Sequence, residues 1–244
     1  MTRAVLLVAH GSHFSPDSSR PVHAHVRRLA ERGFVDEVRA AFWREEPSLS
    51  RGLECCRADD VTVVPVLVSA GYFVSEVIPR EIRLGGRVSQ VDGKTVRYTD
   101  PIGAHPALAT VALRRAEEAG AGPEEPLIVL GHGTTRNVES EKNVILQAER
   151  VRALQPARTV AAAFIEQKPL LTDVLRQFEG QPTTIVPLFV ADGWHVGTTI
   201  REDFGLGGDS GVGSRPAPRI AGAVGTHPLV ADVIVEMVAE AAAW

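Results

Sequence analysis

Residues 5–11 of this chain read VLLVAHG, and residues 127–133 repeat the pattern as LIVLGHG, 122 positions later. Each stretch is a continuous apolar run that ends in His-Gly, which is typical of a strand buried on both faces of a parallel sheet. The same shift aligns later motifs, such as VPVLVSAGYF at 64–73 with VPLFVADGWH at 186–195. The sequence therefore predicts an internal duplication.

Each half contains four apolar runs that alternate with stretches of helical periodicity. This order predicts an α/β fold with one four-stranded parallel sheet per half, flanked by helices. The expected strands cover approximately 4–9, 37–43, 61–68 and 95–99, then 127–131, 159–165, 183–190 and 219–224. The clearest expected helices are 22–32, 107–119, 139–154 and 229–243, and the Gly-rich stretches 85–93 and 205–218 are expected as loops.

The duplication divides the chain into an N-terminal lobe, 1–122, and a C-terminal lobe, 123–244. The Gly- and Pro-rich segment 120–126 is the expected linker between them. Ligands of open α/β sheets bind beyond the carboxyl ends of the strands, and we expect a cleft there. Since one chain supplies both lobes, we expect a monomer.

The composition favours a soluble, cytoplasmic protein that binds neither nucleic acid nor membranes. The chain has 244 residues, a formal net charge of -4 and only two cysteines, which are adjacent. No basic run marks a nucleic-acid surface. No apolar stretch reaches the roughly 20 residues that span a bilayer. Few cysteines fit a reducing compartment.

A histidine closes the first strand of each half. His10 and His132 are each followed by glycine and then by a hydroxyl residue, Ser12 or Thr134. One such histidine could simply hydrogen-bond the backbone. Two at equivalent positions favour a functional role.

The halves differ at two positions that could carry chemistry. His195 stands where the first half has Phe73, and Glu166 stands where it has Arg44. His132, Glu166 and His195 each close a different strand of one expected sheet, so their side chains can converge. Two imidazoles and a carboxylate suit a borderline divalent metal, and they also suit proton abstraction near neutral pH.

Aromatic residues stand beside the two Gly turns, Tyr72 in the first half and Trp194 in the second. They could be core residues or could face a flat ligand. His105 and His227 occur in equivalent Gly-x-His-Pro motifs, which favours a structural role. His13 has no counterpart histidine and is expected on the surface.

These motifs resemble those of the CbiX/SirB-type sirohydrochlorin chelatases, the class II tetrapyrrole chelatases. The resemblance is carried by LVAHGS at 7–12, VPVLVSAGY at 64–72 and VPLFVADGWH at 186–195, and it extends over nearly the whole chain. It implies two flavodoxin-like lobes around a tetrapyrrole cleft, and insertion of Fe²⁺ or Co²⁺ for siroheme or cobalamin synthesis. The metal is then a substrate, with no permanently bound cofactor.

The resemblance also implies which residues act. The family's His pair and Glu match His132, His195 and Glu166 as metal ligands and catalytic groups, so the C-terminal lobe holds the complete site and the N-terminal lobe a degenerate one. Arg44 could anchor a substrate carboxylate. The implied substrate-binding residues are His10, Ser12, Arg44, Tyr72, Thr134, Arg136 and Trp194.

Two other classes of function fit part of this pattern. A non-catalytic tetrapyrrole or metal carrier could use the same cleft. A His-dependent phosphatase also begins with a strand and His-Gly, but it needs an arginine just before the histidine, where this chain has Ala9 and Gly131. The phosphatase is the weaker alternative.

Overall fold

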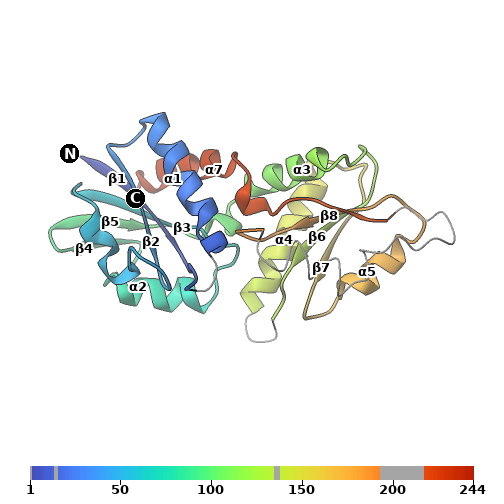
Figure 1. Cartoon of the computed structure of the whole chain (residues 1–244), viewed down its shortest axis with the longest axis horizontal. Coiled ribbons are helices and arrows are strands. Elements are labelled where there is room, and N and C mark those ends of the chain that lie inside the picture. The colour runs from blue at the N-terminus through green and yellow to red at the C-terminus, as the bar shows by residue number, and fades with distance from the viewer. Residues whose placement is uncertain (1, 14–15, 135–137, 193–216) are drawn as a thin grey trace. The chain divides into compact units, whose positions relative to one another are not determined.

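The two halves of the chain form one mainly parallel sheet each, as the repeat predicts (Figure 1). The structure is a computed structural model, and it describes residues 2–13, 16–134, 138–192 and 217–244. The first sheet has the strand order β2-β1-β3-β5-β4. Its strands are β1 (Arg3–Ala9), β2 (Glu37–Phe42), β3 (Asp60–Pro65), β4 (Val88–Val91) and β5 (Lys94–Tyr98).

The second sheet has the order β7-β6-β8-β9 and is parallel throughout. Its strands are β6 (Leu127–Gly131), β7 (Val160–Phe164), β8 (Thr184–Pro187) and β9 (Arg219–Ile220). Since β6 to β9 are the repeat counterparts of β1, β2, β3 and β5, the two sheets share one topology. The 2-1-3 start of this order is that of flavodoxin-like sheets, so the expected fold class is confirmed.

The first sheet carries a fifth strand in a stretch that the sequence predicts as a loop. Strand β4 pairs antiparallel with β5 at the sheet edge. The two strands are joined by Asp92-Gly93, whose φ angles of 50° and 79° are both positive. Asp-Gly with two positive φ angles is the preferred sequence of a two-residue hairpin turn. The prediction of a loop over 85–93 was wrong because it weighed the glycines above this signal.

Helices cover both faces of each sheet. The longer ones are α1 (Arg20–Arg32), α3 (Leu108–Glu118), α4 (Val138–Leu154) and α7 (Val230–Ala241), close to the ranges expected. The shorter elements are η1 (Pro16–Ser18), η2 (Leu49–Cys55), the π-helix η3 (Phe73–Val77), α2 (Ile78–Glu81), η4 (Ile102–Ala104), α5 (Leu171–Gln177) and η6 (Val224–Thr226). Within the described residues, no helix is long and apolar enough to cross a membrane.

Strand β1 lies at the centre of the first core. Alternate residues of a strand point to opposite faces of the sheet. Leu6 and Val8 pack with η2 and α2 residues such as Leu53 and Ile78, whereas Leu7, equally buried, points to the other face. Burial of both faces explains why the strand reads as a continuous apolar run. It also holds the carboxyl end of β1, where His10 follows, in a fixed place.

The last helix of each repeat packs on the sheet of the other repeat. By their contacts, residues 1–105 and 228–244 form one compact unit, and residues 106–227 form the second. In the first unit, α7 packs against α1 and β3, beside which it lies in Figure 1. In the second unit, α3 packs against α4 and β8. The compact units therefore have different limits from the sequence repeat, whose 122/123 boundary falls between α3 and β6.

A histidine–glutamate contact joins each of these two helices, α3 and α7, to the unit in which it packs. His227 Nε2 lies 3.1 Å from Glu118 Oε1 of α3, and His105 Nε2 lies 3.4 Å from Glu240 Oε1 of α7. Glu118 and Glu240 are themselves repeat counterparts. The structural role expected for the two histidines agrees with these contacts.

The pair on α3 makes stability depend on pH. Burial lowers the pKa of His227 below 6.5, more than its contact with Glu118 raises it. Burial raises the pKa of Glu118, but the hydrogen bond to His227 and the charges of His227 and Arg115 bring it below 4.5. When the pH is above the ordinary pKa of a group, that group carries the same charge in the folded and unfolded states, and its contribution to the free energy of unfolding is fully present. When the pH is below that ordinary pKa, the unfolded state binds more protons than the folded state, so this contribution is lost.

We therefore expect the Tm to fall as the pH drops below 6.5, where the unfolded chain protonates His227 and the folded chain does not. His227→Gln should remove this part of the loss, while the later loss from Glu118 begins only below pH 4.5. The measurement is the Tm of both proteins between about pH 8 and about pH 5. Parallel Tm curves for the two proteins would contradict this assignment.

Candidate active site

The two strand-closing histidines share one backbone arrangement. His10 follows β1 and His132 follows β6, and both are exposed although the strands before them are buried. The next residues, Gly11 and Gly133, have positive φ angles of 67° and 79°. The chain therefore turns sharply after each histidine, in a conformation that favours glycine.

The turn after His132 leaves no room for a side chain. A Cβ atom on Gly133 would lie 2.7 Å from Gln167 Cγ and 3.0 Å from Phe164 Cβ. The Gln167 side chain also stabilises the turn, since its Oε1 accepts a hydrogen bond of 2.6 Å from the Thr134 backbone N–H. The position of His132 thus depends on the residues that follow β7.

Gly133→Ala should lower the free energy of unfolding by about 1–3 kcal/mol, because the left-handed backbone is strained for alanine and the new Cβ meets Gln167 and Phe164. Gly180→Ala is the matched control: its φ is 81°, but nothing lies within 4 Å of its Cβ position. Urea denaturation of both variants measures the difference. An equal loss in the two would show that the contacts with Gln167 and Phe164 are unimportant.

His132 and Glu166 come together at the carboxyl end of the second sheet. Strand β7 lies beside β6 in register, Phe164 opposite Gly131. The Glu166 backbone N–H donates to the His132 carbonyl at 3.0 Å. Their side chains approach to 3.7 Å between His132 Nε2 and Glu166 Oε1, with 48% and 60% of each exposed. An exposed imidazole beside a carboxylate can take up a proton or a divalent metal from solution.

The structure brings two of the three predicted metal and catalytic groups together. The third, His195, lies outside the described residues, as do the candidate substrate-binding residues Trp194 and Arg136. Among the residues that are described, no three His, Cys, Asp or Glu side chains are grouped as a metal site requires. His132 and Glu166 supply two such donors.

The first repeat shows the same backbone frame with different side chains. The Arg44 backbone N–H donates to the His10 carbonyl at 2.8 Å, as Glu166 does to His132. The Phe73 ring lies 5.3 Å from the His10 ring, centroid to centroid, and 6.1 Å from the Trp43 ring. An aromatic group thus contacts His10 where the second repeat has His195.

Phe73 begins the π-helix η3, and Tyr72 precedes it. Wide turns of this kind occur frequently at functional sites. Tyr72 is 66% exposed, so it is not a core residue, and a ligand can reach its ring. Of the two roles left open for this aromatic, the core role is excluded, and contact with a flat ligand stays a prediction.

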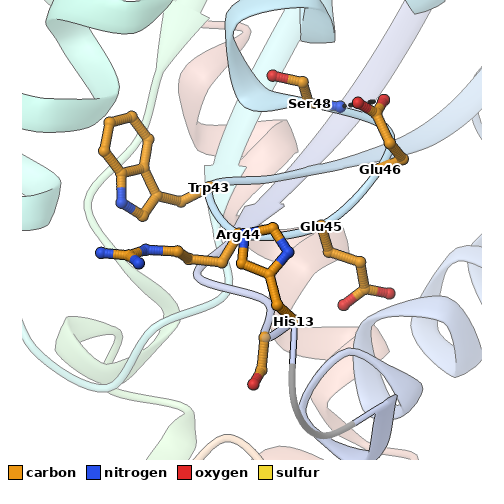
Figure 2. A pocket seen from close by; sticks show the side chains of 7 residues that line it. His13, Trp43, Arg44, Glu45, Glu46 and Ser48 are labelled. Atoms are coloured by element: carbon orange, nitrogen blue, oxygen red, sulfur yellow. Dashed lines mark hydrogen bonds between the residues drawn. The ribbon is translucent and has the colours of Figure 1, made fainter.

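A pocket of about 500 Å³ opens beside this frame in the first repeat (Figure 2). Its lining comes from the turn after His10 and from the segment that follows β2. The lining residues are Ser12, His13, Trp43, Arg44, Glu45, Glu46 and Ser48. Of these, only Ser12 and Arg44 are predicted from the sequence to bind substrate, and His13 is expected on the surface without a role.

Both carboxylates of the pocket contact other groups of the protein, although Glu45 Oε2 is buried without a hydrogen-bond partner among the described residues. Glu46 Oε2 accepts hydrogen bonds from the Ser48 backbone N–H at 3.0 Å and from Arg51 at 2.9 Å. Glu45 Oε1 accepts a hydrogen bond of 2.7 Å from the Ser19 hydroxyl. Figure 2 shows the Glu45 carboxylate directed away from the Arg44 guanidinium.

Comparison with known proteins identifies relatives of the whole chain. A family model described as CbiX matches residues 4–119 and 126–241, one copy per repeat. A curated relative, the probable sirohydrochlorin cobaltochelatase of Halobacterium salinarum, is 38% identical over 269 residues, which cover 99% of this chain and 92% of that protein.

Two solved structures share the fold. A multi-domain protein of Deinococcus radiodurans with structural similarity to chelatases matches with a TM-score of 0.83 and 28% identity, over 98% of this chain. This chain spans 55% of that longer protein. SirB from Bacillus subtilis with Fe³⁺ matches with a TM-score of 0.82 over 100% of this chain and 96% of SirB, and at 23% identity this likeness concerns the fold.

Proposed function

Since this chain belongs to the CbiX family, we propose that it is a sirohydrochlorin chelatase, a lyase that inserts Co²⁺ or Fe²⁺ into the tetrapyrrole ring in cobalamin or siroheme synthesis. The observation that carries the proposal is the His132–Glu166 pair at the carboxyl end of β6 and β7, 3.7 Å apart and open to solvent. The name of the 38% identical relative makes Co²⁺ the first metal to test.

Metal insertion into the tetrapyrrole requires a base and a metal ion at one face of the ring. Two pyrrole N–H protons must leave before the ring nitrogens can bind the ion, and these protons are very weakly acidic. A neutral imidazole can accept a proton near neutral pH. A metal held beside the ring gains the rate advantage of proximity. We assign these tasks to His132, Glu166 and His195.

The repeat register supports the assignment of His195. It pairs His195 with Phe73, whose ring contacts His10 in the first repeat. A half-exposed pair such as His132–Glu166 suits a metal that must leave with the product, since a closed ligand shell would hold the ion too tightly.

Further residues are proposed to bind the substrate around His132, Glu166 and His195. We propose that His10, Ser12, Tyr72, Thr134, Arg136 and Trp194 contribute, with Arg44 treated below. We also propose that the protein acts as a monomer, because both repeats lie in one chain, and that it acts in the cytoplasm, a reducing compartment that suits its two free cysteines.

The test is an assay of the purified protein with sirohydrochlorin and Co²⁺ or Fe²⁺ in turn, followed by the visible spectrum of the ring. We expect the metallated spectrum to appear faster with the protein than in protein-free buffer, for at least one of the two ions. No acceleration with either ion would refute the proposed function.

A further inference from the structure

We propose that the pocket of the first repeat is an anion-binding site that takes a carboxylate side chain of the tetrapyrrole, with Arg44 as its cation, and that it has lost the ability to bind a metal. The nature of the ligand rests on the proposed function. The anion preference rests on the residues of the pocket themselves.

The first argument is a reversal of charge at one position of the repeat. Arg44 and Glu166 leave the backbone from equivalent places, because each N–H donates to the carbonyl of the strand-closing histidine. A carboxylate at this place attracts a divalent cation toward His132. A guanidinium repels the same cation from His10 and attracts an anion instead.

The second argument is that Arg44 is available to a ligand. Among the described residues, its guanidinium has no hydrogen-bond or ion-pair partner, and neither does the imidazole of His13. Of the two carboxylates in the same pocket, Glu46 is bound by Ser48 and Arg51, and Glu45 is bound by Ser19 through Oε1, while Glu45 Oε2 is buried and has no hydrogen-bond partner among the described residues. The pocket therefore offers a cation and an imidazole to an incoming ligand, whereas the one carboxylate oxygen without a partner, Glu45 Oε2, is buried.

The third argument is shape. A pocket of about 500 Å³ is far larger than a single ion and lies within the usual range for small-molecule sites. Figure 2 shows Arg44 and the indole of Trp43 extending to the same side of their segment. An indole offers an apolar face to a flat ring, and a guanidinium binds carboxylate through two parallel hydrogen bonds. A pyrrole ring that carries a carboxylate arm matches this combination.

The test is the equilibrium binding of metal-free sirohydrochlorin, measured from the absorbance of the ring. Arg44→Gln removes the charge from an exposed side chain, and we expect the Kd to rise about tenfold, the loss of one charge-assisted contact. Arg44→Lys should recover part of the affinity. The Kd of the wild type should also rise with salt concentration more steeply than the Kd of Arg44→Gln.

The matched control is Arg80→Gln in the same unit, since Arg80 is 61% exposed and does not line the pocket. An unchanged Kd for Arg44→Gln, or an equal change for Arg80→Gln, would overturn the anion site. No metal is present, so this result does not depend on turnover. If the wild type binds no ring, calorimetry with citrate takes its place, and citrate binding that Arg44→Gln does not weaken, or no binding, also overturns the site.

Discussion

His132→Ala should lower kcat/KM for metal insertion by about 10²–10⁴-fold, the usual contribution of a well-placed acid or base. The variant removes the imidazole that lies 3.7 Å from Glu166 and leaves the carboxylate without its partner. Little change in folding is expected, because the His132 side chain is 48% exposed. The measurement is the initial rate of ring metallation with purified variant and wild type.

The internal duplication supplies the matched control for this prediction. His10→Ala makes the same substitution at the equivalent turn of the first repeat, where Arg44 replaces the carboxylate. We expect a loss of less than about tenfold, because His10 then contributes to binding and not to proton transfer. Equal losses in the two variants would show that the repeats do not divide the work as proposed.

Arg44→Glu combined with Phe73→His should build a second metal site. The two changes give the first repeat the same side chains as His132, Glu166 and His195, and the backbone at His10 and Arg44 already matches that at His132 and Glu166. The new imidazole replaces a ring that lies 5.3 Å from His10. Equilibrium dialysis with Co²⁺ should show about one bound ion per wild-type chain and about two per variant chain.

The single variant Phe73→His is the control for this gain. It adds an imidazole but keeps the Arg44 guanidinium, which repels a divalent ion, so we expect about one ion per chain. A double variant that still binds a single ion would mean that the first repeat lost its metal site through more than these two substitutions.

The sheets and long helices could be predicted from the sequence because burial on both faces leaves a plain pattern. Strands such as β1 and β6 read as apolar runs, and each ends where the apolar run ends. Strand β4 was missed because only Val91 of its four residues is buried and a Gly-rich stretch precedes it. The Asp92-Gly93 turn was the signal that could have located it.

The exchange of α3 and α7 could not be predicted in the same way. The two helices are repeat counterparts and both have an apolar stripe, so either one could cover either sheet. Only the three-dimensional contacts decide between the two packings. The Gly-x-His-Pro motifs indicated a structural role, but their glutamate partners lie more than 100 positions away in the chain.

The candidate site was predictable where it follows strand ends. Neighbouring parallel strands end at one edge of a sheet, which is why His132 and Glu166 meet. The pocket around Arg44 was not predictable, since it depends on where Glu45 and Glu46 point and on which groups bind them. Side-chain directions of this kind are not fixed by spacing along the chain.

The central claim is that this chain catalyses metal insertion rather than carrying the ring or the metal. The most direct measurement is the number of rings that one chain metallates when sirohydrochlorin and Co²⁺ are in large excess over the protein. We predict many turnovers per chain, each faster than the protein-free reaction. A reaction that stops at one ring per chain and then continues only at the protein-free rate would contradict the claim and indicate a carrier.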